Sequence, residues 1–254
     1  MTETLQKKKI GISGSTLNMI AVITMLIDHV AAGVLGRYLT MYALDSTPGA
    51  IDYNTLWNIY EVMRGIGRVA FPIYCFLLVE GFTHTKSVGK YGLRLLAFAF
   101  ISEIPFDLLF SGKAVDLSYQ NVFFTLWIGL LVMWGFQWVE QRQNWHVALK
   151  VPAYMVIFVA GMALADFLAT DYSYYGVFAV TMLYVFRKNK VTQIVAGVVS
   201  FLWEIWAVFA FIPVGFYNGK RGWNMKYFFY FFYPVHLLLL YVLCVILGIS
   251  GYAC

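Results

Sequence analysis

The chain has few charged residues. Only 12% of its 254 residues are Asp, Glu, Lys or Arg, whereas 61% are hydrophobic and 19% are aromatic. An ordinary soluble domain is about 25% charged and about 45–50% apolar, and a globule of this size cannot bury so much apolar surface. The composition therefore excludes a soluble globular enzyme, a disordered chain and a coiled coil. A mean hydropathy of +0.71 indicates that the solvent is a lipid bilayer.

Cysteine is scarce as well, and repeated segments are absent. Cys75, Cys244 and Cys254 are far apart and form no CxxC pair, so we expect neither a disulfide framework nor a metal site. The sequence contains no internal repeat and no low-complexity tract, which favours a single membrane domain over residues 1–254. The lysine-rich start resembles a secretory signal, but Asp28 and His29 interrupt its apolar run. We therefore expect a retained first span.

The remaining pattern predicts an all-α, polytopic helix bundle in the membrane. Eight apolar segments approach the ~20 residues that are needed to cross the hydrocarbon, and eight crossings would put both termini on one side. Residues 1–16 would form a short N-terminal tail. The longest connection, 37–67, contains Pro48-Gly49 and is expected to lie outside or at the interface. The predicted spans are 17–36, 68–84, 91–110, 121–140, 148–168, 172–187, 192–212 and 228–249.

The lysines and arginines predict the orientation of these spans. With eight crossings, eleven basic residues fall on the side of the termini and seven on the other. By the positive-inside rule both termini are then expected in the cytoplasm. The seven on the other side are Arg37, Arg64, Arg68, Lys113, Lys220, Arg221 and Lys226.

Four ionisable residues fall at one depth within the predicted spans. His29, Glu103, Glu204 and His236 all lie about 18 Å from the inner boundary at 1.5 Å per residue. Ionisable groups in a bilayer are costly and suggest function, and histidine exchanges protons near neutral pH. The same layer also suits buried hydrogen-bonded pairs that hold helices together, or a proton-coupled transporter.

The first span carries a second pattern. Asn18 and His29 are eleven residues apart, which places them within ~20° of the same helix face and about 16.5 Å apart along the axis. This distance suits two contacts with one extended ligand, although Asn18 is equally typical of an ordinary polar helix start. Asp28 points ~100° away from His29, toward a neighbouring helix.

Polar residues also gather at the two ends of the predicted spans. Basic groups on the cytoplasmic side suit the phosphates of a nucleotide-containing donor, or are plain positive-inside loops. Those residues are His84, Lys86, Lys90, Arg94 and Arg187. On the other side, polar residues at the span ends predict a vestibule for the second substrate. They are Asp107, Asn121, Tyr175, Asn218 and Arg221, with Glu204 deeper.

The ordered series of motifs resembles the TraX family of membrane proteins from about Leu17 to Leu239. It includes Met25-Leu-Ile-Asp28-His29, Glu80-Gly-Phe-Thr-His84, Ser102-Glu-Ile-Pro-Phe-Asp107, Tyr217-Asn-Gly-Lys-Arg221 and Tyr233-Pro-Val-His236. The resemblance implies a bacterial cytoplasmic membrane protein that acetylates a pilin N-terminus. In the wider group of membrane acyltransferases, sugar O-acetyltransferases carry a basic residue, ten intervening residues and an essential His. Heparan-glucosaminide N-acetyltransferase has Asn in the first place, as Asn18 and His29 do here.

The expected function is transfer of an acetyl group from cytosolic acetyl-CoA to an amine or hydroxyl at the membrane or its outer face. His29 is the expected general base, with Asp28, Glu103 and His236 as further candidate catalytic residues. Asn18 would guide the donor. The acceptor is open among a protein N-terminus, an amino sugar and a glycan hydroxyl, and no nucleic acid partner is expected. The alternative is a proton-coupled transporter, against which the absence of an inverted repeat counts.

Overall fold

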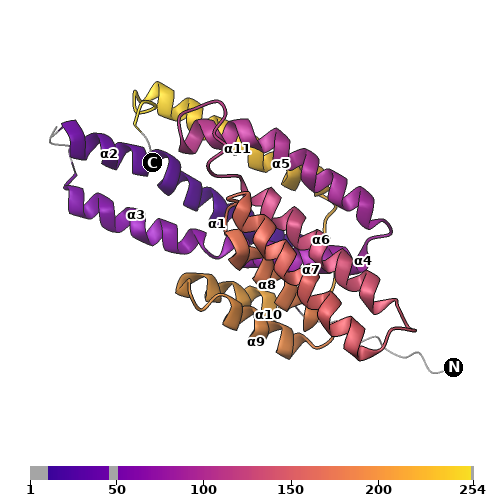
Figure 1. Cartoon of the computed structure of the whole chain (residues 1–254). Helices are drawn as coiled ribbons and strands as arrows, with labels where there is room; N and C mark the ends of the chain where they lie inside the picture. The colour runs from indigo at the N-terminus through magenta and orange to yellow at the C-terminus, as the bar shows by residue number, and fades with distance from the viewer. Residues whose placement is uncertain (1–10, 46–50, 253–254) are drawn as a thin grey trace.

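The computed structural model describes residues 11–45 and 51–252, and the regular elements in these ranges are all helices (Figure 1). Five helical stretches among them are long and apolar enough to cross a membrane, so the prediction of an all-α membrane bundle is confirmed. The described residues do not include Lys7, Lys8, Lys9 or Pro48-Gly49.

The helices follow one another along the chain in this order. The elements are α1 (Gly14–His29), the π-helix η1 (Val30–Leu35), α2 (Gly36–Asp45), α3 (Tyr53–Gly67), α4 (Ala70–His84), α5 (Val88–Phe110), α6 (Val122–Glu140), α7 (Val147–Phe167), α8 (Ser173–Val185), α9 (Lys190–Ser200), the 3₁₀-helix η2 (Ile205–Ala210), α10 (Phe211–Gly215) and α11 (Lys226–Ile246).

Short polar side chains fix where several of these helices begin. Ser13, Asp52, Ser87, Asn121 and Asn189 each accept a hydrogen bond from a backbone N–H in the first turn of the following helix. Such caps satisfy donors that the helix itself leaves unpaired. The boundaries are therefore a local property of the sequence, and for most helices they agree with the predicted spans.

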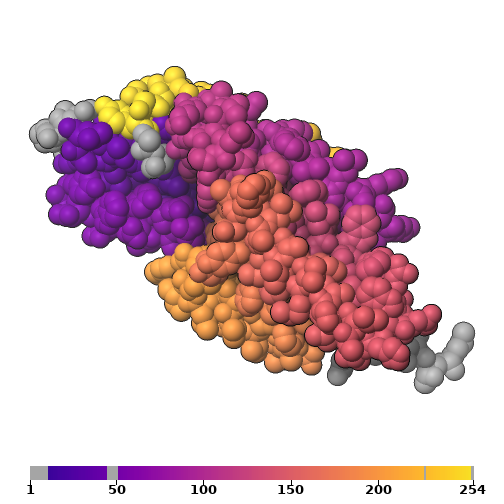
Figure 2. Space-filling model, viewed as in Figure 1, coloured from indigo at the N-terminus to yellow at the C-terminus, as the bar shows by residue number. Residues whose placement is uncertain are grey.

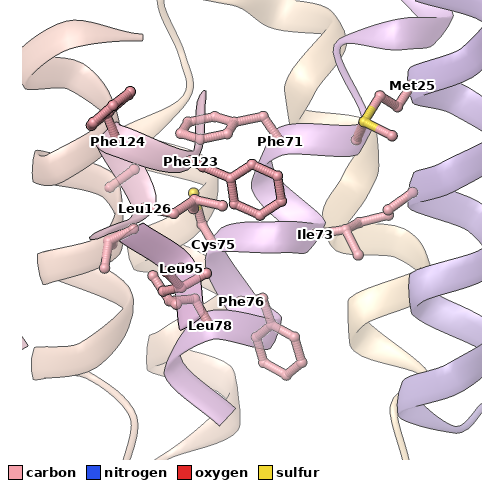
Figure 3. Close-up of a cluster of buried hydrophobic side chains, with 14 of the residues drawn as sticks. Met25, Phe71, Ile73, Cys75, Phe76, Leu78, Leu95, Phe123, Phe124 and Leu126 are labelled. Atoms are coloured by element: carbon pink, nitrogen blue, oxygen red, sulfur yellow. The ribbon is translucent and has the colours of Figure 1, made fainter. Parts of the chain in front are cut away.

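The core is centred on α4, which packs between α1, α6 and α8. Its Phe71, Ile73 and Phe76 are almost completely buried, and Figure 3 shows them beside Met25 and Phe123. In a bilayer, lipid tails are as apolar as the core, so close helix packing replaces the hydrophobic effect as the main driving force. Gly161 illustrates this, since a Cβ there would lie 2.2 Å from a methyl carbon of Val132 on α6.

The predicted span 192–212 is wrong, because this segment turns back on itself. Helix α9 is followed by a turn, and η2 with α10 then return along it. Lys190, at the start of α9, donates hydrogen bonds of 2.6 and 2.8 Å to the carbonyls of Gly215 and Tyr217, at the end of the other limb. Both ends of the hairpin therefore lie at the same end of the bundle. Hydropathy alone does not separate an apolar hairpin from an apolar span.

The hairpin leaves the start of α1 and the end of α11 at opposite ends of the bundle (Figure 1). At one end, which we call the N-terminal end, the amide of Gly14 donates a 2.8 Å hydrogen bond to the carbonyl of Lys220. At the other, Arg37 of α2 donates bonds of 2.5 Å to the carbonyls of Ser250 and Tyr252. The count of eight crossings is therefore not confirmed. Gly14 and Tyr252 lie at opposite ends of the bundle, whereas the sequence predicted both ends of the chain on one side.

The described part of the predicted connection 37–67 is largely helical, in α2 up to Asp45 and in α3 from Tyr53. Helix α2 continues the line of α1 through the π-helix, and α3 leads almost without interruption into α4. The α2–α3 pair forms the indigo and purple part of the molecule in Figure 2, where a recess separates it from the orange helices. Asp52, within this connection, caps the start of α3.

Candidate functional site

Two cavities extend into the bundle and share part of their lining. The first, the N-terminal cavity, has a volume of about 570 Å³ and is lined by Asn18, His84, Arg94 and Arg221 among others. The second, the histidine cavity, has a volume of about 470 Å³ and is lined by His29 together with charged residues of α1, α3 and α5. Four residues line both cavities and form what we call the junction. They are Met25, Tyr74, Val122 and Tyr233.

His29 and His236 are in direct contact. Nδ1 of His29 lies 2.7 Å from Nε2 of His236, and the rings are almost parallel with centroids 4.9 Å apart. Nδ1 of His236 lies 2.7 Å from the carbonyl oxygen of Phe232. A carbonyl only accepts, so Nδ1 of His236 carries a proton and, in the neutral ring, Nε2 is an acceptor. His29 must then donate from Nδ1, which leaves its Nε2 unprotonated.

Local backbone features set the direction of the two histidines. His29 is the last residue of α1, and the chain continues as a π-helix from Val30; single π turns of this kind are common at functional sites. Across the bundle, Pro234 lies inside α11 two residues before His236. The hydrogen bond from Nδ1 of His236 to the carbonyl of Phe232, four residues earlier on α11, holds the His236 ring against its own helix.

Charged pairs line the rest of the histidine cavity. Asp28 forms an ion pair of 2.7 Å with Arg64 of α3, as the ~100° offset from His29 predicted. Gly67 makes this close approach possible, since a Cβ there would overlap the Asp28 side chain. One turn beyond Arg64, Arg68 lies 3.3 Å from Glu204 of the hairpin turn.

The turn between α7 and α8 delivers two further residues to this cavity. Tyr172 adopts a left-handed conformation with φ of 62°, stacks on Phe71 at 3.7 Å between ring centroids, and hydrogen-bonds Arg68. Asp171 accepts a 2.6 Å hydrogen bond from the Tyr119 hydroxyl, and burial raises the pKa of its carboxyl. A non-glycine residue at positive φ is costly and is common at functional sites.

Comparisons with known proteins show the family to which the chain belongs. The model of the family described as TraX protein matches residues 13–244, which is most of the chain. The chain belongs to the TraX family. A probable fimbrial assembly protein, FimC of serogroup H1, from Dichelobacter nodosus is 28% identical over 263 residues, covering 92% of this chain and 96% of the relative. No solved structure matches the chain.

In this TraX-family chain, the predicted layer of two histidines and two glutamates is divided between different partners. The histidines meet, but Glu103 accepts a hydrogen bond from Nδ2 of Asn121 at the start of α6, and Glu204 is paired with Arg68. Among the described residues, neither glutamate lines either cavity. Equal depth along separate helices therefore did not bring all four side chains together.

The residues expected to hold a donor are also divided. Asn18, His84 and Arg94 line the N-terminal cavity, although the Asn18 side chain donates a 3.0 Å bond to the carbonyl of Gly14. Lys86 and Lys90 are exposed and do not line it. Arg187 lies away from the cavity, 2.9 Å from Glu140.

The residues expected to form an outer vestibule lie in three places. Asp107 lines the histidine cavity, where it accepts a 2.8 Å bond from the Asp116 amide. Tyr175 is outside both cavities and its ring lies 4.7 Å from that of Trp203. Asn218 and Arg221 lie at the N-terminal end, where Asn218 donates to the carbonyl of Gly11. For these two the expected side is wrong, because the hairpin returns the chain before they are reached.

Sequence reasoning missed several residues of the histidine cavity. Arg64 and Arg68 were counted only as basic loop residues, and the residues of the α7–α8 turn carried no expectation. The four-residue spacing of the two arginines on one helix face was the available signal. The aromatic residues offered none, because tyrosines are common throughout the chain. The missed residues are Arg64, Arg68, Tyr119, Asp171, Tyr172 and Tyr233.

Proposed function

We propose that this protein is an integral membrane acetyltransferase that moves an acetyl group from acetyl-CoA to an amine or hydroxyl acceptor. The observation that carries the proposal is the junction of the two cavities beside His29. A donor in one cavity and an acceptor in the other can meet there without either crossing the bundle. Family membership supports this reading, since the TraX resemblance implies acetylation of a pilin.

The N-terminal cavity suits the donor. Arg94 reaches it with a buried Nε that makes no hydrogen bond within the described residues, and Arg221 and His84 line the same cavity. Guanidinium groups bind phosphates in bidentate fashion. The deeper walls are mainly apolar and aromatic, as a pantetheine arm requires, and lead from these basic groups toward Met25 at the junction.

The orientation of the bundle fits a cytosolic donor. With the hairpin in place, Lys220, Arg221 and the start of α11 join the N-terminal end, and the basic residues at the other end within the described ranges are Arg37, Arg64, Arg68 and Lys113. This asymmetry is greater than eight crossings would give. By the positive-inside rule the N-terminal end faces the cytoplasm.

His29 is the proposed general base. Its unprotonated Nε2 takes the proton of the acceptor as the acceptor attacks the thioester carbon. His236 holds the required tautomer by accepting from Nδ1 of His29, and the same hydrogen bond stabilises the imidazolium that forms. After the C–S bond breaks, the proton on Nε2 passes to the thiolate of CoA.

The test uses full-length protein, radiolabelled acetyl-CoA and a panel containing glucosamine and short peptides with free N-termini. We expect acetyl transfer by the wild type and a loss of about 10²–10⁴-fold in His29→Ala. His146→Gln is the matched control, since His146 is exposed outside both cavities and its loss should leave the rate unchanged. If His29→Ala transferred acetyl groups as fast as the wild type, His29 would not be the general base.

Two cavities that share part of their lining also suit a second function, proton-coupled transport past the histidine pair. It predicts solute or proton flux in sealed vesicles without consumption of acetyl-CoA, and loss of that flux in His29→Ala. Release of CoA that depends on an added acceptor would instead support the acetyltransferase. Both assays use the same purified protein.

A further inference from the structure

An acyl transfer of this kind needs a hydrogen-bond donor for the oxygen of the tetrahedral intermediate, and the proposed function above leaves that group unassigned. We propose, on the basis of that function, that the hydroxyl of Tyr233 is this donor and that Tyr233 is a catalytic residue. The proposal follows from where Tyr233 lies and from how its hydroxyl is held.

The thioester carbonyl must be reached from both sides. The donor arrives through the N-terminal cavity and the acceptor through the histidine cavity, so the reacting carbon lies where the two meet. Arg64 and Arg68 line only the histidine cavity and already pair with Asp28 and Glu204. Of the four junction residues, only Tyr74 and Tyr233 have a side chain that donates a hydrogen bond.

Tyr233 is the one that packs against the proposed base. Its ring centroid lies 5.8 Å from that of His29 and 5.7 Å from that of His236. It lies three residues before His236 on α11 and so projects from nearly the same helix face. The side chain is also edge-on to Phe123 at 5.1 Å, and only 3% of the residue is exposed. A group so tightly held loses little freedom when it meets a developing charge.

The hydroxyl is held in a way that leaves its proton for the substrate. The amide of Val122, in the first turn of α6, hydrogen-bonds the Tyr233 oxygen. Because that bond uses the oxygen as an acceptor, the O–H remains able to donate. The partial positive charge at a helix N-terminus lies on the same side and favours an oxyanion near it.

The reaction can then be followed atom by atom. The acceptor nitrogen or oxygen forms a bond to the thioester carbon, its proton passes to Nε2 of His29, and the carbonyl π electrons move onto oxygen. Tyr233 donates a hydrogen bond to that oxygen without giving up its proton. The carbonyl then re-forms as the C–S bond breaks, and the thiolate takes the proton from His29.

The experiment compares Tyr233→Phe with Tyr74→Phe, which removes the other hydroxyl of the junction and leaves both rings in place. The full-length protein is assayed with acetyl-CoA and whichever acceptor the panel identifies, and the KM for acetyl-CoA is measured with kcat. We expect kcat to fall about 10²–10³-fold in Tyr233→Phe with a nearly unchanged KM, and to fall less in Tyr74→Phe. Both parameters should stay near wild type in Tyr241→Phe, which removes a hydroxyl from the same helix outside both cavities. An unchanged thermal unfolding midpoint would show that Tyr233→Phe remains folded.

Replacing Tyr233 with ring-fluorinated tyrosines adds a measurement that a purely structural role would not move. The series lowers the pKa of the phenol with little change of shape, so kcat should change progressively along it while KM does not. It also keeps the proposal testable if Tyr233→Phe does not fold.

Three outcomes would overturn the assignment: kcat near wild type in Tyr233→Phe, a rise in KM alone, or an equal loss of kcat in Tyr74→Phe. The proposed acetyltransferase function is tested separately from the role of Tyr233. Acceptor-dependent transfer by the wild type that needs His29, with no effect of Tyr233→Phe, removes only the role of Tyr233. Absence of any wild-type transfer removes the function and the role together.

Discussion

At the scale of single residues, the hydrogen bonds of His236 decide what His29 can do. The proton on Nδ1 of His236 is fixed by the Phe232 carbonyl, and this in turn fixes the tautomer of His29. The sequence placed both histidines at one depth but did not reveal their contact, which depends on how α1 and α11 are rotated. Asn18, in contrast, bonds its own helix, as the ordinary interpretation of a polar helix start predicted.

Replacing His236 by Leu should lower kcat by at least about 10²-fold. The variant removes the acceptor for Nδ1 of His29, so the ring is free to take the tautomer that carries its proton on Nε2. The KM for acetyl-CoA should change little, since His236 does not line the N-terminal cavity. Steady-state kinetics on the full-length protein measure both, and a change in KM alone would contradict the positioning role.

Charge reversal at Arg94 should weaken the donor site. Arg94→Glu places a carboxylate in the N-terminal cavity beside the proposed phosphates, so the KM for acetyl-CoA should rise at least tenfold while kcat falls less. Lys90→Glu makes the same change of charge one turn earlier on α5, where the side chain is exposed and outside the cavity. Equal effects of the two variants would point to general attraction of the donor instead of a defined site.

At the scale of elements, the hairpin of α9, η2 and α10 most changes the expected structure. Its composition is as apolar as that of a span. The prediction failed because hydropathy shows that a segment is apolar but not whether the chain crosses the membrane or turns back within it. What turns the chain is tertiary: Glu204 pairs with Arg68 at the tip, and Lys190 bonds the carbonyls at the base. Caps such as Ser87 and Asn121, which act within a few residues, fixed other helix starts near their predicted positions.

Cysteine labelling tests the hairpin. In a variant with Cys254→Ser, cysteines introduced at Lys188 and Lys220 flank the hairpin at exposed positions, and Cys75 and Cys244 are buried. Both new cysteines should react with an impermeant maleimide from the same side of a sealed vesicle. Leu117→Cys, in the exposed connection between α5 and α6, should react from the opposite side. Labelling of positions 188 and 220 from different sides would show that the segment between them crosses the membrane, and would contradict the hairpin.

At the scale of the whole molecule, the hairpin removes one predicted crossing, and five helical stretches of the described residues are long and apolar enough to cross a membrane. The buried Arg37 fixes the C-terminal segment at the end of the bundle opposite Gly14 by donating hydrogen bonds to the carbonyls of Ser250 and Tyr252. The same change moves Lys220 and Arg221 to the N-terminal end and increases the charge asymmetry between the two faces.

Fusions at the C-terminus test this topology in bacterial cells. Alkaline phosphatase attached after Cys254 should be active, because that enzyme needs the oxidising side of the membrane to form its disulfides. A fusion truncated after Lys188, at the N-terminal end, should be inactive. The reverse pattern would place the N-terminal end outside and separate the proposed donor cavity from cytosolic acetyl-CoA.

The sequence by itself determined the solvent, the helical class, most helix boundaries and the family, because composition, caps and ordered motifs are local properties. It also singled out His29 and His236, since an ionisable group in an apolar helix is conspicuous. Only the tertiary structure decided that these rings touch, that Glu103 and Glu204 pair with other residues, and that Tyr233 lines both cavities. Those facts depend on the rotation and crossing of helices that are distant in the chain, and on a hairpin whose apolar surface is indistinguishable from that of a span.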